Sequence, residues 1–397
     1  MSDDLSTLFL RHVCQTSDGP MGLVVARAAG STVWDTEGRT YLDLLAGMGV
    51  ANVGHAHPEV VAAVRAQAER HLHVMVYGEF VQEAQVRLAA RLASLLDPAL
   101  SVVYFTSSGA EAVDGALKTA RKHTGRTGFV AFEGGFHGDT WGALSVGGNP
   151  VYRRPFEPLL PGVRFLPFDD EHALAAIDER TAAVIVEPVQ AEGGVRIPRP
   201  AFLMALRARC DATGTLLVFD EVVTAFGRTG RRFGYEHSSV VPDLLVLAKA
   251  LGGGLPLGAF IGRPEVMATL RHDPPLAHVT TFGGHPLSCA AGLAALEVLV
   301  RDDLAARAAR VGATLVERLA RHVGRGGLAA VRGIGMLIGL EFDAPERCAT
   351  FARKAWEARI ILNWTLHCDT VVRLAPPLVL TDDEADQAIT TIGHLLG

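Results

Sequence analysis

Lys249 is the residue whose place in the chain most suggests chemistry, because it ends the apolar run Asp243–Ala248 and precedes a run of glycines. The other three lysines, Lys118, Lys122 and Lys354, lie beside arginines on segments expected to be surface helices. An amine at the end of a buried strand loses hydration in its charged form, so its pKa falls. A neutral lysine amine suits Schiff-base chemistry. The ordinary alternative is a lysine that extends to the surface.

Asp220 ends a second apolar run, Leu216–Phe219, and is followed by Glu221. A strand that ends in Asp-Glu is also typical of the magnesium-binding strand of nucleotide hydrolases, but no lysine here follows a glycine, as their phosphate loop requires. A dinucleotide site is disfavoured too, because Gly47–Asn52 lacks the third glycine of that fingerprint. The remaining interpretation is a carboxylate that keeps a pyridinium nitrogen protonated, while Lys249 anchors the same ring.

A possible phosphate cradle follows the predicted strand Val102–Phe105. The next residues, Thr106–Glu111, carry small hydroxyl side chains and a glycine, and an alanine-rich helix begins there. Such a turn aims backbone N–H groups and the helix dipole at a phosphate. An ordinary helix cap formed by a serine is the alternative.

The segments that would position these residues alternate between short apolar strands and helix-length stretches. The expected strands are Val102–Thr106, Gly128–Phe132, Val163–Leu166, Ala182–Glu187, Thr215–Asp220 and Leu244–Ala248. Helical patterns such as Ala110–His123 and Pro200–Thr213 lie between several of them. This alternation predicts an α/β fold with a mostly parallel sheet and helices on both faces. Ligands bind at the carboxyl ends of such strands, where Asp220 and Lys249 are placed.

The pattern changes after about residue 300. Two helical stretches are expected over Arg301–His322, strands around Leu328–Val331 and Met336–Phe342, a helix near Arg347–Arg359, and a last helix that begins at Thr381 with Glu384 completing a capping box. The first fifty residues contain a strand-like stretch, Thr32–Asp35. We predict that residues 1–50 and 296–397 form one smaller α+β domain beside a large domain of residues 51–295.

Composition limits the classes of function. The chain has 397 residues, 49% of them hydrophobic, and a net charge of −6, so wholesale disorder is disfavoured and nothing calls for nucleic acid or an anionic membrane as partner. Five scattered cysteines without CxxC spacing, and a beginning that does not look like a signal peptide, predict a cytoplasmic protein with reduced thiols. The pairs His55/His57 and His71/His73 have no third ligand, so no metal is expected.

Taken as a set and in order along nearly the whole chain, several motifs resemble the class III aminotransferases, the family of acetylornithine, ornithine, 4-aminobutyrate and other omega-amino acid aminotransferases. These motifs are Thr106–Ala112, Phe136–Gly138, Val186–Gly194, Phe219–Val222 with Phe226–Gly230, Ala248–Ala250, Thr280–Gly284 and Val372–Leu378.

The resemblance implies a fold-type I enzyme with a seven-stranded type of sheet, which binds pyridoxal 5'-phosphate (PLP) and acts as a homodimer by a ping-pong mechanism. It implies the following roles: catalytic residues Lys249, Asp220 and Glu187; cofactor contacts from Ser108, Gly109, Ala110, Phe136, His137, Val222, Val223 and, across the dimer, Thr281; and substrate contacts from Arg373 and Glu192. An amino acid or amine would be the donor, and an oxo acid such as 2-oxoglutarate the acceptor.

Three positions depart from the family pattern. Ser107 stands where an asparagine is frequent, Val223 where a glutamine usually lies near the ring hydroxyl of the cofactor, and His285 where an asparagine is usual. None of these changes touches Lys249 or Asp220. The change at Val223 removes a polar contact with the cofactor.

Two alternatives to transamination stay open on the sequence. Racemases, an aminomutase and a decarboxylase share this fold and these motifs, and a fold does not fix a function. A non-catalytic binding protein on the same scaffold is disfavoured by the joint presence of Lys249, Asp220 and Arg373. Within the transaminase interpretation, Glu192 is predicted to pair with Arg373 and to swing away when the substrate brings its own carboxylate.

Overall fold

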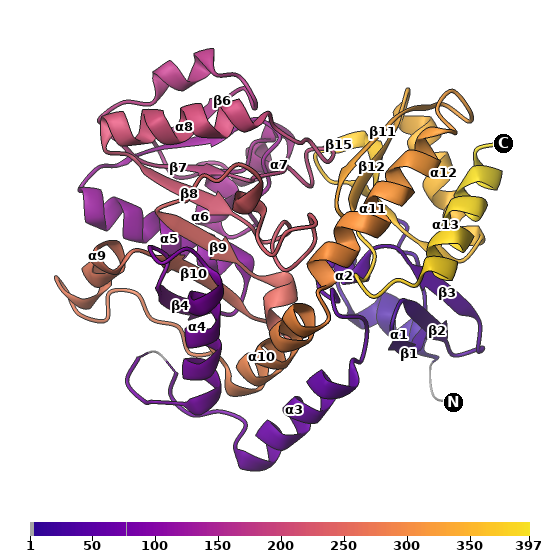
Figure 1. The fold of residues 1–397 in the computed structure, drawn as a ribbon, viewed down its shortest axis with the longest axis horizontal. Helices are drawn as coiled ribbons and strands as arrows, with labels where there is room; N and C mark the ends of the chain where they lie inside the picture. Colours follow the sequence, from indigo (N-terminus) through magenta and orange to yellow (C-terminus); the bar gives the residue numbers. More distant parts are fainter. Residues whose placement is uncertain (1–3, 77) are drawn as a thin grey trace.

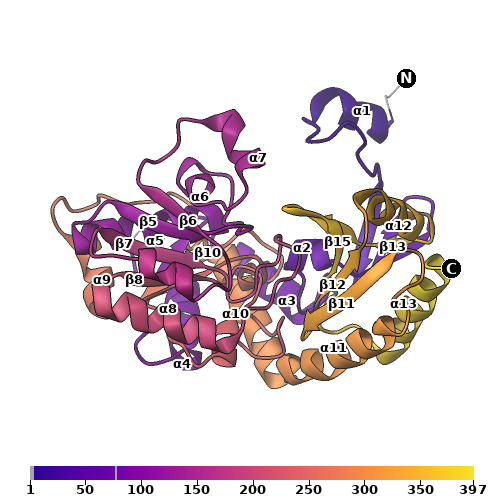
Figure 2. The same cartoon turned by 90° about the horizontal axis from the view of Figure 1, so that it is seen from above.

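The chain folds into a large lobe and a smaller lobe, with their elements arranged as in Figures 1 and 2. The computed structural model describes residues 4–76 and 78–397. Figure 2 shows helix α1 (Leu5–His12) standing off from the body of the smaller lobe.

The large lobe is built on a seven-stranded sheet in the order β4-β10-β9-β8-β7-β5-β6. Its strands are β4 (Val102–Thr106), β5 (Gly128–Phe132), β6 (Val163–Leu166), β7 (Thr181–Val186), β8 (Leu216–Asp220), β9 (Leu244–Leu247) and β10 (Gly258–Gly262). The neighbours from β9 to β6 pair in parallel, whereas β10 runs antiparallel to both β4 and β9. The carboxyl ends of β8 and β9 therefore lie side by side, which brings Asp220 and Lys249 to one edge of the sheet.

Alternate residues of each strand pack against helices on opposite faces of this sheet, as a strand period of two requires. Val218 and Val246 belong to the core beside α5 (Gly109–Thr124). Phe219 and Leu245 belong to the core that includes Phe202 of α8 (Pro200–Thr213). The strands are thus buried on both sides, which explains their nearly continuous apolar sequences.

Shorter elements complete the large lobe. They are α3 (Pro58–Arg70), α4 (Glu83–Leu95), α6 (Trp141–Ser145), α7 (Pro150–Arg153), α9 (Pro264–Met267), α10 (Pro286–Arg301) and the 3-10 turns η1 (Arg154–Phe156), η2 (His172–Ala176), η3 (Gly234–His237), η4 (Lys249–Gly252) and η5 (Ala268–Arg271). Helix α10 packs closely on α3 and α4.

The smaller lobe has two four-stranded sheets, β1-β2-β3-β13 and β11-β12-β15-β14. Its strands are β1 (Val25–Ala29), β2 (Thr32–Asp35), β3 (Thr40–Asp43), β11 (Leu328–Ile334), β12 (Leu337–Phe342), β13 (Ile360–Ile361), β14 (Asn363–Thr365) and β15 (Cys368–Leu374); its helices are α2 (Ala46–Gly49), α11 (Leu304–Ala320), α12 (Pro345–Glu357) and α13 (Asp382–Leu395). Strand β13 pairs in parallel with β3, so segments from both ends of the chain share one sheet.

The predicted strands of the large sheet all form, within one residue at their ends, and the capping box of Thr381 and Glu384 is present at α13. Two predictions were wrong or incomplete. A single helix, α11, takes the place of the two expected over Arg301–His322. Strand β10 was not predicted, because Gly258–Gly262 is short and bounded by glycines. Across the described residues, no helix is long and apolar enough to span a bilayer.

Candidate active site

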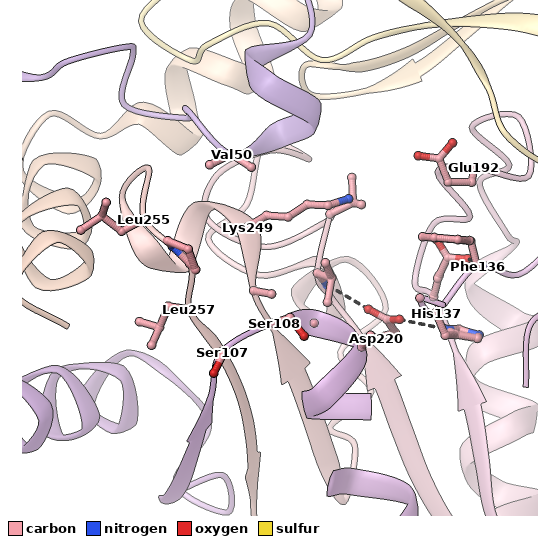
Figure 3. Close-up of a pocket in the computed structure, with 18 of the residues that line it drawn as sticks. Val50, Ser107, Ser108, Phe136, His137, Glu192, Asp220, Lys249, Leu255 and Leu257 are labelled. Atoms are coloured by element: carbon pink, nitrogen blue, oxygen red, sulfur yellow. Dashed lines mark hydrogen bonds and ion pairs between the residues drawn. The ribbon is translucent and has the colours of Figure 1, made fainter. Parts of the chain in front are cut away.

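A cavity of about 420 Å³ opens above the carboxyl ends of the central strands (Figure 3). The residues that line it are Val50, Ser107, Ser108, Gly109, Ala110, Phe136, His137, Gly138, Glu187, Glu192, Asp220, Val222, Val223, Ala248, Lys249, Gly254, Leu255, Pro256 and Leu257. They come from segments far apart in the sequence, which the parallel sheet brings to one edge.

Lys249 comes two residues after the end of β9, separated from it by Ala248, and reaches into this cavity (Figure 3). Its backbone is in the left-handed region, with φ of 50°, a conformation that costs a residue with a side chain about 1–2 kcal/mol. Burial lowers the pKa of the Lys249 amine, and the positive charge of Arg373 lowers it further, against the opposing charges of Glu192, Asp220 and Glu187. The site therefore favours the neutral, nucleophilic amine.

Asp220 is held rigidly at the end of β8. Its Oδ2 lies 2.7 Å from Nδ1 of His137, and its Oδ1 accepts the backbone N–H of Val222 at 3.0 Å. Burial alone would lower the pKa of His137, but the hydrogen bond and charge of Asp220 outweigh burial and raise it. Two hydrogen bonds therefore fix the carboxyl group of Asp220 at the wall of the cavity.

Glu187 fixes the loop that carries Phe136. Its Oε1 accepts the N–H of Phe136 and its Oε2 accepts the N–H of Ala191, both at 3.0 Å. Burial raises the pKa of Glu187 to about 7, and the charge of Asp220 contributes to the rise, whereas His137 opposes it. A carboxyl group with a pKa near neutrality is able to hold or release a proton under working conditions.

The turn before α5 provides an anion site. Ser108 caps the helix by accepting the N–H of Glu111, and the N–H groups of Gly109 and Ala110 have no partner within the described part of the chain. Those free N–H groups and the helix dipole favour a phosphate. A side-chain carbon added at Gly109 would lie 3.1 Å from Val222, so glycine is the residue that leaves the space between this turn and Val222 fully open.

Arg373 and Glu192 form a buried ion pair at another part of the wall. Glu192 lines the cavity, whereas Arg373, on β15, lies behind it. Burial would raise the pKa of Glu192, but the charge and hydrogen bond of Arg373 outweigh burial and lower it. Met48 also approaches Arg373, with Sδ 3.5 Å from Nη2. Both ends of the Arg373 guanidinium are therefore in contact with other side chains, Nη1 with Glu192 and Nη2 with Met48.

The turn between β14 and β15 closes over Glu192. The N–H of Leu366 donates to Oε2 of Glu192 at 2.9 Å, and the hydroxyl of Tyr152 donates to the carbonyl of Leu366 at 2.8 Å. The ring of His367 stacks on Tyr152 and meets Phe136 edge-on. Leu366 and His367 were not predicted as part of the site, because nothing in their local pattern indicates a contact with a residue more than 170 positions away.

The predicted site residues are distributed as follows. The cavity is lined by Ser108, Gly109, Ala110, Phe136, His137, Glu187, Glu192, Asp220, Val222, Val223 and Lys249. Arg373 is reached through Glu192. Thr281 does not line the cavity; it lies exposed on the loop before α10.

The fold is α/β, and its cavity gathers a buried lysine amine, three carboxyl groups and a helix start with free N–H groups. The family model described as aminotransferase class-III matches residues 13–396. An acetylornithine aminotransferase of Methanosarcina mazei is 43% identical over 96% of this chain and 93% of its own length, and one of Methanopyrus kandleri is 44% identical over 97% and 96%.

Solved structures agree. An ornithine aminotransferase of Toxoplasma gondii superposes with a TM-score of 0.91 at 34% identity, over 98% of this chain and 93% of that one. A PLP-bound amine transaminase from an uncultivated Pseudomonas species gives 0.89 at 31% identity, over 97% of both chains. The chain belongs to the class-III aminotransferase family and is an aminotransferase with the fold of type I transaminases.

Proposed function

We propose that this aminotransferase binds PLP at Lys249 and moves an amino group from an ω-amino acid to 2-oxoglutarate. The observation that carries the proposal is the arrangement around one cavity of a neutral-favouring lysine amine, a rigid carboxylate at Asp220 and an anion-binding turn at Gly109. A lysine amine, a carboxylate and an anion-binding turn around one cavity are the groups that would anchor the aldehyde, hold the ring nitrogen and bind the phosphate of PLP.

The residues present fit this cofactor. The turn of Ser108, Gly109 and Ala110 would hold the phosphate, Asp220 would hold the ring nitrogen, and the ring of Phe136 would lie against the pyridine. When bound, PLP supplies an electron sink that stabilises negative charge on the donor carbon. The free N–H groups of the turn and the space kept by Gly109 support this assignment.

The chain's own residues supply the proton handling. The Lys249 amine would accept the proton of the donor carbon on its Nζ and pass it on to the cofactor carbon within the same half-reaction, and it would move a proton in the opposite direction in the second half. Asp220, fixed by His137, would keep the ring nitrogen of the bound cofactor protonated. Glu187 positions Phe136 and, with its pKa of about 7, carries a charge that varies near neutral pH.

The substrate proposal rests on the Arg373–Glu192 pair and on the relatives. Relatives at 43–44% identity are named acetylornithine aminotransferases. We infer that N-acetylornithine is the first donor to test and that Glu192 stays on Arg373 while the ω-amine reacts. Glu192 then leaves when 2-oxoglutarate, or the glutamate formed from it, brings a carboxylate to Arg373.

We also propose that two chains form the working unit, with Thr281 completing the partner's phosphate site. Exposed apolar side chains surround the Thr281 loop and the neighbouring segment of the large lobe: Leu72, Val74, Phe80, Val81, Leu276, Val279 and Phe282. A patch of this kind is typical of a protein interface. The division into a large domain of residues 51–295 and a small domain from both termini belongs to the same proposal.

The absorbance spectrum of the protein saturated with PLP tests the proposed function. A band above 400 nm should be bleached by N-acetyl-L-ornithine and restored by 2-oxoglutarate. L-ornithine, 4-aminobutyrate and L-glutamate are the comparison donors. If every donor except N-acetyl-L-ornithine bleaches the band, N-acetylornithine is not the substrate. If no donor changes the band, a racemase-like reaction is favoured over transamination. The same spectrum from Lys249→Ala, without that band, is the control for the anchoring residue.

A further inference from the structure

Arg228 is a fully buried arginine whose hydrogen bonds all go to neutral groups. Its Nη1 donates to the carbonyl of Met336 at 3.1 Å and to that of Pro376 at 2.6 Å, and its Nη2 donates to Oδ1 of Asn52 at 2.6 Å. Its Nε has no partner in the part of the chain that the structure describes. No carboxylate among the described residues forms an ion pair with it.

A buried charge without an ion partner is costly. Removing an ion from water costs several kcal/mol that neutral carbonyls only partly return. Burial lowers the pKa of Arg228 to about 9, and the positive charge of Arg373 contributes to the lowering, while Asp43 opposes it. Arg228 therefore stays charged at neutral pH. The oxygens of Asp43 bond to His55 and to two backbone N–H groups, so Asp43 does not pair with Arg228 directly.

The position of Arg228 connects this charge to the substrate site. Arg228 lies in the loop after β8, in the large lobe, and Met336 lies in the turn between β11 and β12, in the small lobe. Pro376 comes three residues after Arg373 on the segment that leaves β15. One guanidinium thus connects the loop behind Asp220 to the strand that carries Arg373.

We propose that Arg228 is a specificity-determining residue for the substrate carboxylate: its charge, held on the carbonyl of Pro376 three residues after Arg373, strengthens the attraction of this pocket for an anion without touching it. The inference rests on the proposed function, in which Arg373 receives the carboxylate. Glu192 pairs directly with Arg373, whereas Arg228 has no carboxylate in direct contact within the described part of the chain, and Asp43 acts on it only from a distance. In a dry interior the attraction between charges falls off slowly, so a carboxylate on Arg373 also interacts with Arg228.

The competing explanation is a purely structural connection between the two lobes, and the chain offers a matched control for it. Arg126 also binds three backbone carbonyls, with its Nη1 at 3.1 Å from Thr181, 2.9 Å from Thr213 and 3.0 Å from Gly214. All of these lie within the large lobe, at the far ends of its strands. Loss of Arg126 should reduce stability without changing the charge near Arg373.

The test measures binding of glutarate, a dicarboxylate without amino or oxo group, to the PLP-saturated protein by titration calorimetry. Arg228→Gln should raise the dissociation constant at least tenfold, equivalent to about 1.4 kcal/mol. Arg228→Lys keeps the charge and should stay within about threefold of wild type. Arg126→Gln should leave glutarate binding unchanged. KM for carboxylate donors should rise in Arg228→Gln, while kcat/KM for butylamine, which has no carboxylate, should not fall.

Two results would overturn the proposal: unchanged glutarate affinity in Arg228→Gln, or equal weakening in Arg228→Gln and Arg228→Lys, which would make the role geometric. If Arg228→Gln does not fold, Asn52→Asp is the second variant to test. It places a carboxylate against Nη2 of Arg228 and should weaken glutarate binding by a similar factor. Unchanged glutarate affinity in Asn52→Asp also overturns the proposal. If the wild-type protein transfers no amino group between substrates that carry a carboxylate, the proposed function itself is refuted, whatever the variants show.

Discussion

At the scale of single residues, charged neighbours act in opposite directions on the pKa of the Lys249 amine. Arg373 lowers the pKa of Lys249, and Glu192 raises it. Arg373→Gln should therefore raise the pKa of the Lys249 amine, so that the reactive neutral form appears at higher pH. Glu192→Gln should lower the pKa of the same amine, so that the neutral form appears at lower pH. The measurement is the rate of Lys249 acylation against pH in the PLP-free protein, followed by mass spectrometry.

Lys354, exposed on α12, is the internal control for this experiment, because its profile should be the same in both variants. Shifts in the same direction for Arg373→Gln and Glu192→Gln would contradict the electrostatic account. In that case burial alone would govern the amine.

The Glu192–Arg373 pair leads to a second prediction at this scale. Glu192→Gln leaves Arg373 without a charged partner, so a ligand that brings a carboxylate should bind more tightly, and a donor that leaves Arg373 empty should react less well. The ratio of kcat/KM for glutamate to that for N-acetylornithine should rise roughly tenfold, which corresponds to about 1.4 kcal/mol. Steady-state kinetics with both donors gives this ratio, and an unchanged ratio removes the role assigned to Glu192.

At the scale of elements, the start of α5 combines two functions, a helix cap and a phosphate site, and a substitution separates them. Ser108→Ala removes the side chain that accepts the N–H of Glu111 and should cost about 1 kcal/mol of unfolding free energy. It should also weaken PLP binding by about tenfold, because a hydroxyl in the cradle is lost. Chemical denaturation and equilibrium dialysis measure the two effects.

Thr381→Ala at the capping box of α13 is the matched control, since this helix begins in the small lobe with the same kind of cap. It should cost a similar free energy of unfolding and leave PLP affinity as in wild type. A loss of PLP affinity in both variants would mean that Ser108 acts through stability alone.

The elements also show how far sequence reasoning reaches. Strands β8 and β9 could be predicted from their apolar runs, which lead to Asp220 and Lys249, and parallel pairing then brings these two residues together. Strand β10 could not, because five residues bounded by glycine carry too little periodic signal. The cover over Glu192 depends on the register of β14 with β15, where a shift at Thr365 sets the turn, and such a register is decided by tertiary packing.

At the scale of the whole molecule, the isolated chain leaves one predicted residue without a role, because Thr281 is exposed and does not line the cavity. The polar residues of the cavity could be inferred from motifs within the chain. The phosphate site that Thr281 is proposed to complete could not be found near Thr281 within one chain, since the proposal places that site in a second copy of the chain. A symmetric dimer would bring each Thr281 loop to the other chain's site.

Subunit mixing tests this arrangement. Lys249→Ala should be inactive because its own amine is missing, and Thr281→Asp should be nearly inactive because a carboxylate would repel the phosphate of the partner's cofactor. In a mixed dimer, the chain that keeps Lys249 receives an intact Thr281 from the Lys249→Ala chain. After unfolding and refolding together in equal amounts, roughly a quarter of wild-type activity should return, since half of the dimers are mixed and each has one intact site. Light scattering on each variant checks that dimers form. If the refolded mixture of Lys249→Ala and Thr281→Asp chains forms dimers but is no more active than either variant alone, Thr281 does not serve the partner's site.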